Sequence, residues 1–305
     1  MLNRYEPIGI DFHTYLAAAI VGVQHGWPLI YDQNLVAFAQ ALGWSSQSSG
    51  AERWLYAAAA LAPWWVLHAV NLGQVAPLVA AGVVLATRFA RERNDLAAGL
   101  ALSLLYLKPN TALLVPPALL VAGRFRAFGS WAVVGALIGV ASLVTMGPAG
   151  VAAYVGQLRA TLPEGASNLT VEGAFGVTGT VATALRVVIA AIALVTAYRL
   201  RHSPGLAIAA GAVGSLLVVP YLHGSDLCLF SAAAWIVWEE RAGWTWRLPI
   251  AAGWLVSVPY INSTSLAIRL NRWTLFEVGL LIALTIAAWW PAGQRVSGLA
   301  SASGS

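Results

Sequence analysis

Long runs of apolar residues follow one another along the chain from Trp54 onward, separated by short groups of Gly, Pro and charged residues. The runs are roughly 13 to 20 residues long, and about 20 apolar residues in a helix cross the hydrocarbon layer of a bilayer. The runs show no period-two alternation of the kind that a barrel strand requires, and lipid provides no water to satisfy an open strand edge. The pattern therefore predicts an all-α, polytopic transmembrane protein.

About ten membrane helices are predicted. They are Trp54–Val70, Val75–Phe89, Leu96–Leu107, Thr111–Gly123, Ser130–Met146, Val181–Tyr198, Gly205–Leu222, Leu227–Trp238, Leu248–Tyr260 and Trp273–Trp290. We expect one transmembrane domain over 1–305, with an N-terminal outer loop or amphipathic segment (1–53), a helical membrane core (54–290) and a flexible tail (291–305). Met1 to Ile10 predicts a loop rather than a cleaved signal, because Glu6 and Pro7 interrupt it.

Composition supports a membrane protein and excludes several other classes. Hydrophobic residues make up 59% of the chain and charged residues 10%, against about 25% charged residues in soluble domains. The basic residues lie in short clusters and form no continuous face, which argues against nucleic-acid binding. The single cysteine, Cys228, excludes an intramolecular disulfide. His25 and His68 have no acidic or Cys partner at ligand spacing, so neither a metal nor a cofactor is expected.

The arginines fall between alternate pairs of predicted helices. Clusters occur at Arg88, Arg91 and Arg93, at Arg124 and Arg126, at Arg199 and Arg201, and at Arg241 and Arg247, with Arg295 in the tail. Since short loops rich in Arg stay in the cytoplasm, the connections between these clusters are predicted to face outward. The outward connections are 71–74, 108–110, 147–180, 223–226 and 262–272.

Candidate site residues gather in these outward connections. Lys108 is the only lysine of the chain, and a cation at a helix end either binds a ligand or extends toward the lipid headgroups, two readings between which residue type does not decide. His223 is a candidate for orienting an acceptor or sharing a proton, while Asp226 either serves a site or caps the next helix. Asn71 and Gln74 either hydrogen-bond a sugar or phosphate or form a tight turn.

Several motifs in order resemble the glycosyltransferases of family 87, which are integral-membrane enzymes of the GT-C class. The motifs are Gly9-Ile-Asp11-Phe12-His13-Thr-Tyr15, Gly26-Trp-Pro-Leu-Ile-Tyr31-Asp32, Asn71-Leu-Gly-Gln74-Val-Ala-Pro77, Leu107-Lys108-Pro109-Asn110, Asn168-Leu-Thr and Pro220-Tyr-Leu-His223-Gly-Ser-Asp226. The resemblance spans Gly9 to about Phe230. It implies a polyprenyl-phosphate-linked sugar donor, with mannose as the first choice, and a glycolipid or glycan acceptor.

The resemblance also implies roles for individual residues. Asp11 occupies the position of the family's catalytic base in the motif Asp-Phe-x-x-Tyr, which Tyr15 completes next to the substrate. A carboxylate there accepts the proton of the attacking hydroxyl. Lys108 and Arg186 are the cations expected to stabilise the departing phosphate, which needs no general acid. From residue type alone, Asp11 instead caps a helix from Phe12 to Val23.

Two departures from the family leave alternatives open. Only ten residues precede Asp11, where the family has a transmembrane helix, so a shortened N-terminus is expected. If Asp11 and Asn71 both face outward, either 15–31 enters the membrane or 54–70 is re-entrant with a bend at Pro63; otherwise Asp11 is cytoplasmic. The prediction is a multi-pass transferase of a bacterial plasma membrane, and the alternatives are a transporter or lipid flippase, or an inactive shortened homologue.

Overall fold

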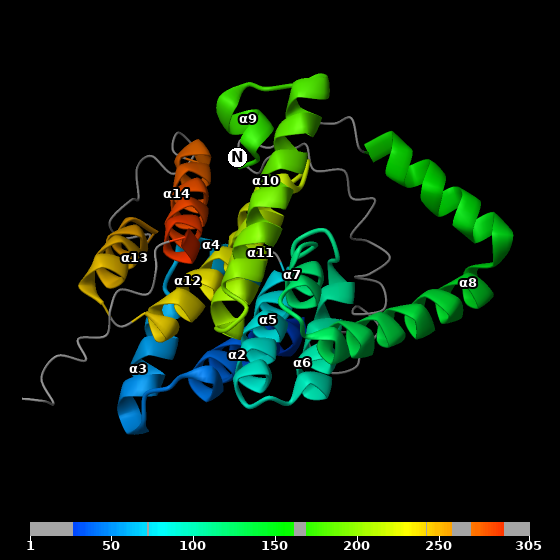
Figure 1. The fold of residues 1–305 in the computed structure, drawn as a ribbon. Coiled ribbons are helices and arrows are strands. Elements are labelled where there is room, and N and C mark those ends of the chain that lie inside the picture. The colour runs from blue at the N-terminus through cyan, green and yellow to red at the C-terminus, as the bar shows by residue number, and fades with distance from the viewer. Residues whose placement is uncertain (1–26, 72, 162–168, 242, 258–269, 290–305) are drawn as a thin grey trace, which may run out of the picture.

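The structure is a computed structural model that describes residues 27–71, 73–161, 169–241, 243–257 and 270–289. Within these ranges every regular element is a helix (Figure 1), as the apolar runs predicted. The helices are α2 (Trp27–Ser45), α3 (Gly50–Ala60), α4 (Trp64–Asn71), α5 (Ala76–Arg91), α6 (Asp95–Leu102), η1 (Ser103–Leu107), α7 (Val115–Val121), α8 (Phe125–Thr161), α9 (Val171–Phe175), α10 (Gly179–Arg199), α11 (Pro204–Val218), η2 (Gly224–Leu227), α12 (Cys228–Glu240), α13 (Trp244–Ser257) and α14 (Leu270–Trp289).

Helix α11 is the centre of the bundle. Every residue from Gly205 to Leu217 is buried, as expected for a helix that is apolar on all sides. It packs against α5, α7, α10, α12 and α14. Glycines permit these contacts, because a Cβ on Gly211 would lie 2.7 Å from the Cβ of Ala118 and one on Gly214 would collide with Ala193.

The end of α5 meets the end of α12 and the start of α11. Arg91 donates from Nε to Oε1 of Glu240 at 2.8 Å, and Ser203 donates to the other carboxylate oxygen of Glu240 at 2.9 Å. Arg91 also donates to the carbonyl of Ser45 at 2.9 Å, which adds the end of α2. Arg91 belongs to one arginine cluster, and Ser203 and Glu240 lie beside two others. Three of the arginine clusters therefore lie at one end of the bundle.

The structure adds a helix where none was predicted. Helix α2 occupies residues 27–45 of the segment expected to be an outer loop or amphipathic segment, and it packs against α3, α4 and α5. Its apolar face includes Phe38, Ala41 and Leu42, which are buried and have helical spacing. Polar residues from Asp32 to Gln40 interrupt the apolar run and conceal the helix in a hydropathy profile.

Two predicted spans are interrupted. The span 54–70 separates into α3 and α4 around Pro63, which removes a backbone donor and cannot continue a regular helix. The span 111–123 begins as turns and becomes helical only at Val115. The amide of Leu114 donates to the Ser215 hydroxyl at 2.8 Å, so the core helix α11 satisfies a backbone group that the turns leave free.

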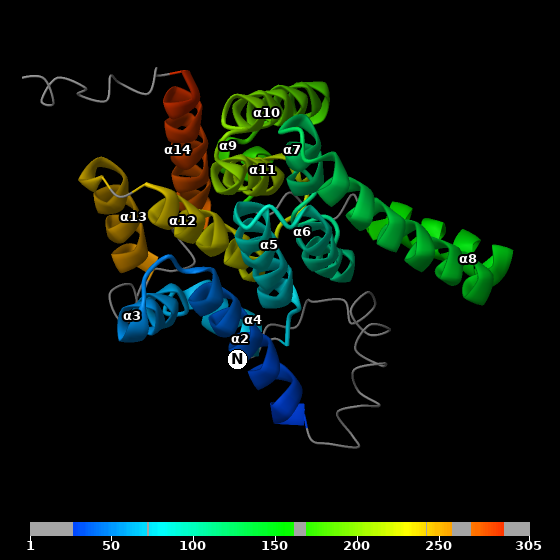
Figure 2. The same cartoon turned by 60° about the horizontal axis from the view of Figure 1, so that its bottom comes forward.

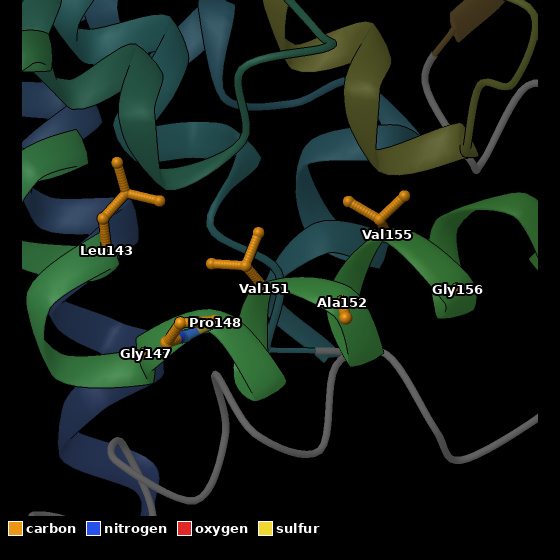
Figure 3. A pocket seen from close by; sticks show the side chains of 7 residues that line it. All are labelled: Leu143, Gly147, Pro148, Val151, Ala152, Val155 and Gly156. Atoms are coloured by element: carbon orange, nitrogen blue, oxygen red, sulfur yellow. The ribbon is translucent and has the colours of Figure 1, made fainter.

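Helix α8 projects away from the bundle, as both views show (Figures 1 and 2). It contains the predicted span 130–146 and bends at Gly147, whose φ of 62° is left-handed, immediately before Pro148. The concave side of the bend is a hollow of about 680 Å³ lined by α8 residues alone: Leu143, Gly147, Pro148, Val151, Ala152, Val155 and Gly156 (Figure 3). This hollow has no polar side chain to bind a sugar or phosphate.

Length and composition identify two helices in the described ranges that can cross a membrane. They are residues 125–156 of α8 and α10, and only 6% and 22% of their most apolar windows are buried within the protein. An exposed apolar helix is costly in water and stable in lipid. Three other apolar helices, over residues 95–107, 204–218 and 273–289, are shorter than the roughly 20 residues that cross the hydrocarbon layer. The predicted number of ten is therefore not established.

Candidate functional site

Three connections between helices bring polar side chains together at the end of the bundle away from the Arg91 and Glu240 ion pair. They are the α4–α5 turn, the turns between η1 and α7, and the segment from α11 through η2 to α12. We call the group the Lys108–Asp226 cluster; its members are Gln74, Lys108, Thr111, Tyr221, His223 and Asp226. Sequence analysis named four of the six.

Asp226 is the centre of the cluster and is completely buried. Its Oδ1 atom lies 2.7 Å from Nζ of Lys108 and accepts a hydrogen bond from the Thr111 hydroxyl at 3.1 Å. Its Oδ2 atom accepts from the backbone amide of His223 at 2.9 Å. Three donors from two connections therefore compensate the buried carboxylate, as a buried charge requires.

Proline and a chain turn place Lys108. Because Lys108 precedes Pro109, an extended backbone is favoured, and its φ of −153° and ψ of 76° end the η1 helix. The amide of Thr111 then donates to the Lys108 carbonyl at 3.2 Å, which closes a turn. The turn brings Lys108 and Thr111 to the same carboxylate oxygen. The Lys108 side chain keeps 16% of its surface exposed.

Glycines shape the two connections that face Lys108. Gly73 has a left-handed φ of 64°, and the amide of Gln74 donates to the Ala69 carbonyl at 2.8 Å, closing the end of α4. Nζ of Lys108 donates weakly to Oε1 of Gln74 at 3.5 Å. In η2, a Cβ on Gly224 would lie 2.9 Å from the Trp64 ring, so glycine allows η2 to approach α4.

His223 and Tyr221 form the outer part of the cluster. The Tyr221 hydroxyl lies 2.6 Å from Nε2 of His223, and their ring centroids are 4.6 Å apart at 80°. Tyr221 is 46% exposed, so the dyad faces outward from the buried carboxylate. Sequence analysis missed Tyr221 and Thr111. Tyr221 lies within a quoted motif and Thr111 directly follows one, which was the available signal, but isolated hydroxyl residues in loops are common.

The other predicted site residues have separate outcomes. Arg186 of α10 pairs with Glu172 of α9, and in the described residues no ion pair or hydrogen bond joins it to the cluster. Asn71 is the last residue of α4, and its side chain is outside the described part of the structure. Asp11 and Tyr15 also lie outside the described residues, so their roles stay predictions.

The chemistry of the cluster suits an anionic, hydroxyl-bearing ligand. An ammonium group carries three donors, and two of those on Lys108 meet Asp226 and Gln74. Asp226 is unsuited to be a general base because its two oxygens already accept from three donors. Across the described residues, no group of three or more His, Cys, Asp or Glu side chains is arranged to hold a metal ion.

Comparison with known families gives a match over residues 13–220, about two thirds of the chain, to the sequence model of glycosyltransferase family 87. The matched range contains Gln74, Lys108 and Thr111, and ends just before Tyr221. No curated protein and no solved structure matches the chain.

Proposed function

We propose that this chain, which belongs to glycosyltransferase family 87 and is thus a membrane glycosyltransferase, takes its sugar from a polyprenyl-phosphate-linked donor. The sugar, with mannose as the first choice, passes to a lipid or glycan acceptor on the extracytoplasmic side. The observation that supports this most directly is the Lys108 ammonium group at a break between helices, with Gln74 beside it. A phosphate attached to a lipid tail reaches such a position from the membrane surface.

Lys108 is proposed to contact the donor phosphate. One of its three N–H groups has no partner among the described residues, and the proposal assigns it to a phosphate oxygen. As the bond between the anomeric carbon and the phosphate oxygen breaks, negative charge grows on the phosphate and the ammonium stabilises it. Asp226 offsets the cost of burying the ammonium, and it holds the group in place as a positioning residue.

The acceptor side is assigned to Asp11 and His223. The acceptor oxygen attacks the anomeric carbon, the phosphate leaves with the bonding electron pair, and the Asp11 carboxylate takes the hydroxyl proton. His223, with its ring fixed by Tyr221, is proposed to orient the acceptor hydroxyl. Arg186 is paired with Glu172, and in the described residues no ion pair or hydrogen bond joins it to the Lys108–Asp226 cluster, so the proposal assigns phosphate binding to Lys108.

We infer a multi-pass protein of a bacterial plasma membrane, with about ten crossings and the Lys108–Asp226 cluster outside. Helices α8 and α10 support it, since they are long and apolar enough to cross a bilayer. Where a shorter apolar helix such as α11 ends at membrane depth, its backbone ends require protein neighbours, and α11 packs among five other helices.

The test is a transfer assay in proteoliposomes with radiolabelled polyprenyl-phosphate mannose and a glycolipid acceptor fraction. We expect label in a new glycolipid with the wild type, no turnover but measurable donor binding with Asp11→Asn, and weaker donor binding with Lys108→Gln. Arg88→Gln is the matched control, because Arg88 is exposed and pairs only with Glu92 one turn away in the described structure. Label that merely changes leaflet would indicate a transporter, and full activity of Asp11→Asn would remove Asp11 from the mechanism.

A further inference from the structure

Nine arginines of the described residues fall into two groups by the partner that the side chain contacts. Four of them, Arg88, Arg91, Arg124 and Arg186, form ion pairs with carboxylates. Five others lie over aromatic rings instead: Arg53, Arg199, Arg201, Arg241 and Arg247. A guanidinium on a ring uses its face for that contact and keeps its in-plane N–H groups for an acceptor.

Arg241 and Arg247 make this contact reciprocally across the turn between α12 and α13. Arg241 follows the last residue of α12 and lies 5.7 Å from the ring centroid of Trp246 in α13. Arg247, in the first turns of α13, lies 4.9 Å from the ring centroid of Trp238 in α12. The residue that follows α12 and a residue of α13 thus each lie over a tryptophan of the facing helix, on the two sides of one turn.

Both arginines lack an acceptor. The Nε atoms of Arg241 and Arg247 are buried, and neither has a hydrogen-bond partner in the described structure. A buried unsatisfied donor is costly, and a guanidinium without a hydrogen-bonded carboxylate keeps its donors for another acceptor. The buried Nε atoms are out of reach of an external anion, but an anion that accepts from the outer Nη groups of both arginines would offset their charge.

The nearby carboxylates are already engaged elsewhere. Both oxygens of Glu240 bind Arg91 and Ser203. The two oxygens of Glu239 accept from the amide of Gln47 at 2.6 Å and the hydroxyl of Ser46 at 3.3 Å. Glu52, which acts on Tyr56 together with Arg247, accepts from the Tyr56 hydroxyl at 2.8 Å. None of these three glutamates forms an ion pair with Arg241 or Arg247 in the described ranges, so no described carboxylate accepts from the two guanidinium groups.

The surroundings fit a lipid headgroup. Trp244, at the first position of α13, is 73% exposed, and tryptophan collects where the bilayer meets water. The first turn of α13 has no acidic residue, so its free amides add partial positive charge. The turn follows Glu240, the residue that marks the arginine-rich end of the bundle. Basic and aromatic residues at the boundary between bilayer and water attract anionic lipids.

We propose that the α12–α13 turn binds the phosphate of an anionic phospholipid headgroup through the in-plane N–H groups of Arg241 and Arg247. Trp238 and Trp246 hold the two guanidinium groups in position, and the acyl chains extend along the bundle. The site lies at the opposite end of the bundle from the Lys108–Asp226 cluster and takes no part in sugar transfer.

The test counts lipids retained by the purified full chain in native mass spectrometry, with phosphatidylglycerol and phosphatidylcholine of equal acyl chains. We expect the wild type to retain phosphatidylglycerol preferentially, and Arg241→Gln/Arg247→Gln to bind it about 30-fold more weakly, at about 1 kcal/mol per arginine. Arg88→Gln is the control and should match the wild type. Equal retention of the two lipids, unchanged binding by the double variant, or an equal loss in the control would overturn the proposal.

Two further experiments test whether the site binds a lipid rather than free phosphate, and whether it requires guanidinium groups rather than positive charge alone. Inorganic phosphate at millimolar concentration should leave phosphatidylglycerol bound, and complete displacement would show a free-phosphate site instead. The variant Arg241→Lys/Arg247→Lys keeps both charges but lacks the planar guanidinium groups that stack on tryptophan and offer paired N–H donors, so we expect binding several-fold weaker than in the wild type. Binding equal to the wild type would overturn the proposed guanidinium contacts.

Discussion

Lys108 and Asp226 compensate each other at the scale of single residues. The ammonium is 16% exposed and the carboxylate is buried, so neither charge is adequately solvated without the other. Removing one partner of such a pair commonly costs about 3–5 kcal/mol, whereas replacing both with apolar residues is often neutral. The pair therefore allows its contribution to stability to be separated from its contribution to function.

We predict that Asp226→Leu lowers the free energy of unfolding by about 3–5 kcal/mol, because it leaves the Lys108 ammonium buried without its counter-ion. Lys108→Met/Asp226→Leu should recover most of this loss yet remain inactive, since no cation is left for the phosphate. Thermal unfolding in detergent and the transfer assay measure the two effects. Thr111→Val, which removes one hydrogen bond to Asp226, is the control and should cost about 1 kcal/mol. An active double variant would contradict the role of Lys108.

Sequence reasoning found site residues where polarity is unexpected and missed those where it is ordinary. Gln74, Lys108, His223 and Asp226 stood out because they interrupt apolar runs in connections of the same predicted side. The Thr111 hydroxyl gave no such contrast, although it contacts the central carboxylate. Arg186 was expected at the phosphate because it lies near the outer end of its apolar segment. The sequence does not reveal its ion pair with Glu172, because Glu172 lies in a long connection.

The sequence predicts a helix well when one long apolar run forms the whole helix. Helix α10 matches its predicted range within two residues at each end. Helix α2 was missed because burial of a few apolar residues against α5 stabilises it, and its mean hydropathy does not reveal this packing. The breaks at Pro63 and before Val115 depend on proline and on hydrogen bonds from neighbours, which a hydropathy profile averages away.

Helix α14 contains a polar residue that packing alone does not explain. Glu277 is completely buried on the same face as Trp273, Thr274, Leu281 and Leu284. Neither of its carboxyl oxygens has a hydrogen-bond partner in the described structure. We predict that Glu277→Met raises the free energy of unfolding by about 1–3 kcal/mol, because it removes unsatisfied polar atoms and keeps a similar length.

Thermal unfolding of the purified chain measures the effect of Glu277→Met. Glu92→Met is the control, since the Glu92 side chain is 49% exposed, and a surface substitution usually changes stability by less than about 0.5 kcal/mol. A lower stability of Glu277→Met would show that the carboxyl has a partner that the described residues do not supply.

The whole molecule has two chemically different ends. Helices α5 and α12 both begin near the Lys108–Asp226 cluster, and both end at the Arg91 and Glu240 ion pair. The alternation of arginine-rich and arginine-poor connections predicted this separation, because each pair of spans returns the chain to the same side. The fold alone does not determine which end faces the cytoplasm. Because short loops rich in Arg stay in the cytoplasm, we predict that the Arg91 and Glu240 end is cytoplasmic and the Lys108–Asp226 cluster is outside.

Labelling with a membrane-impermeant thiol reagent tests this orientation in intact cells. Cys228 is buried and is replaced by Ser to give a cysteine-free background. Asn110→Cys, beside Lys108, should react from outside, whereas Glu92→Cys, beside Arg91, should react only after the cells are made permeable; both positions are exposed. The opposite pattern would place the cluster in the cytoplasm, away from an extracytoplasmic acceptor, and the proposed transfer reaction would lose its geometry.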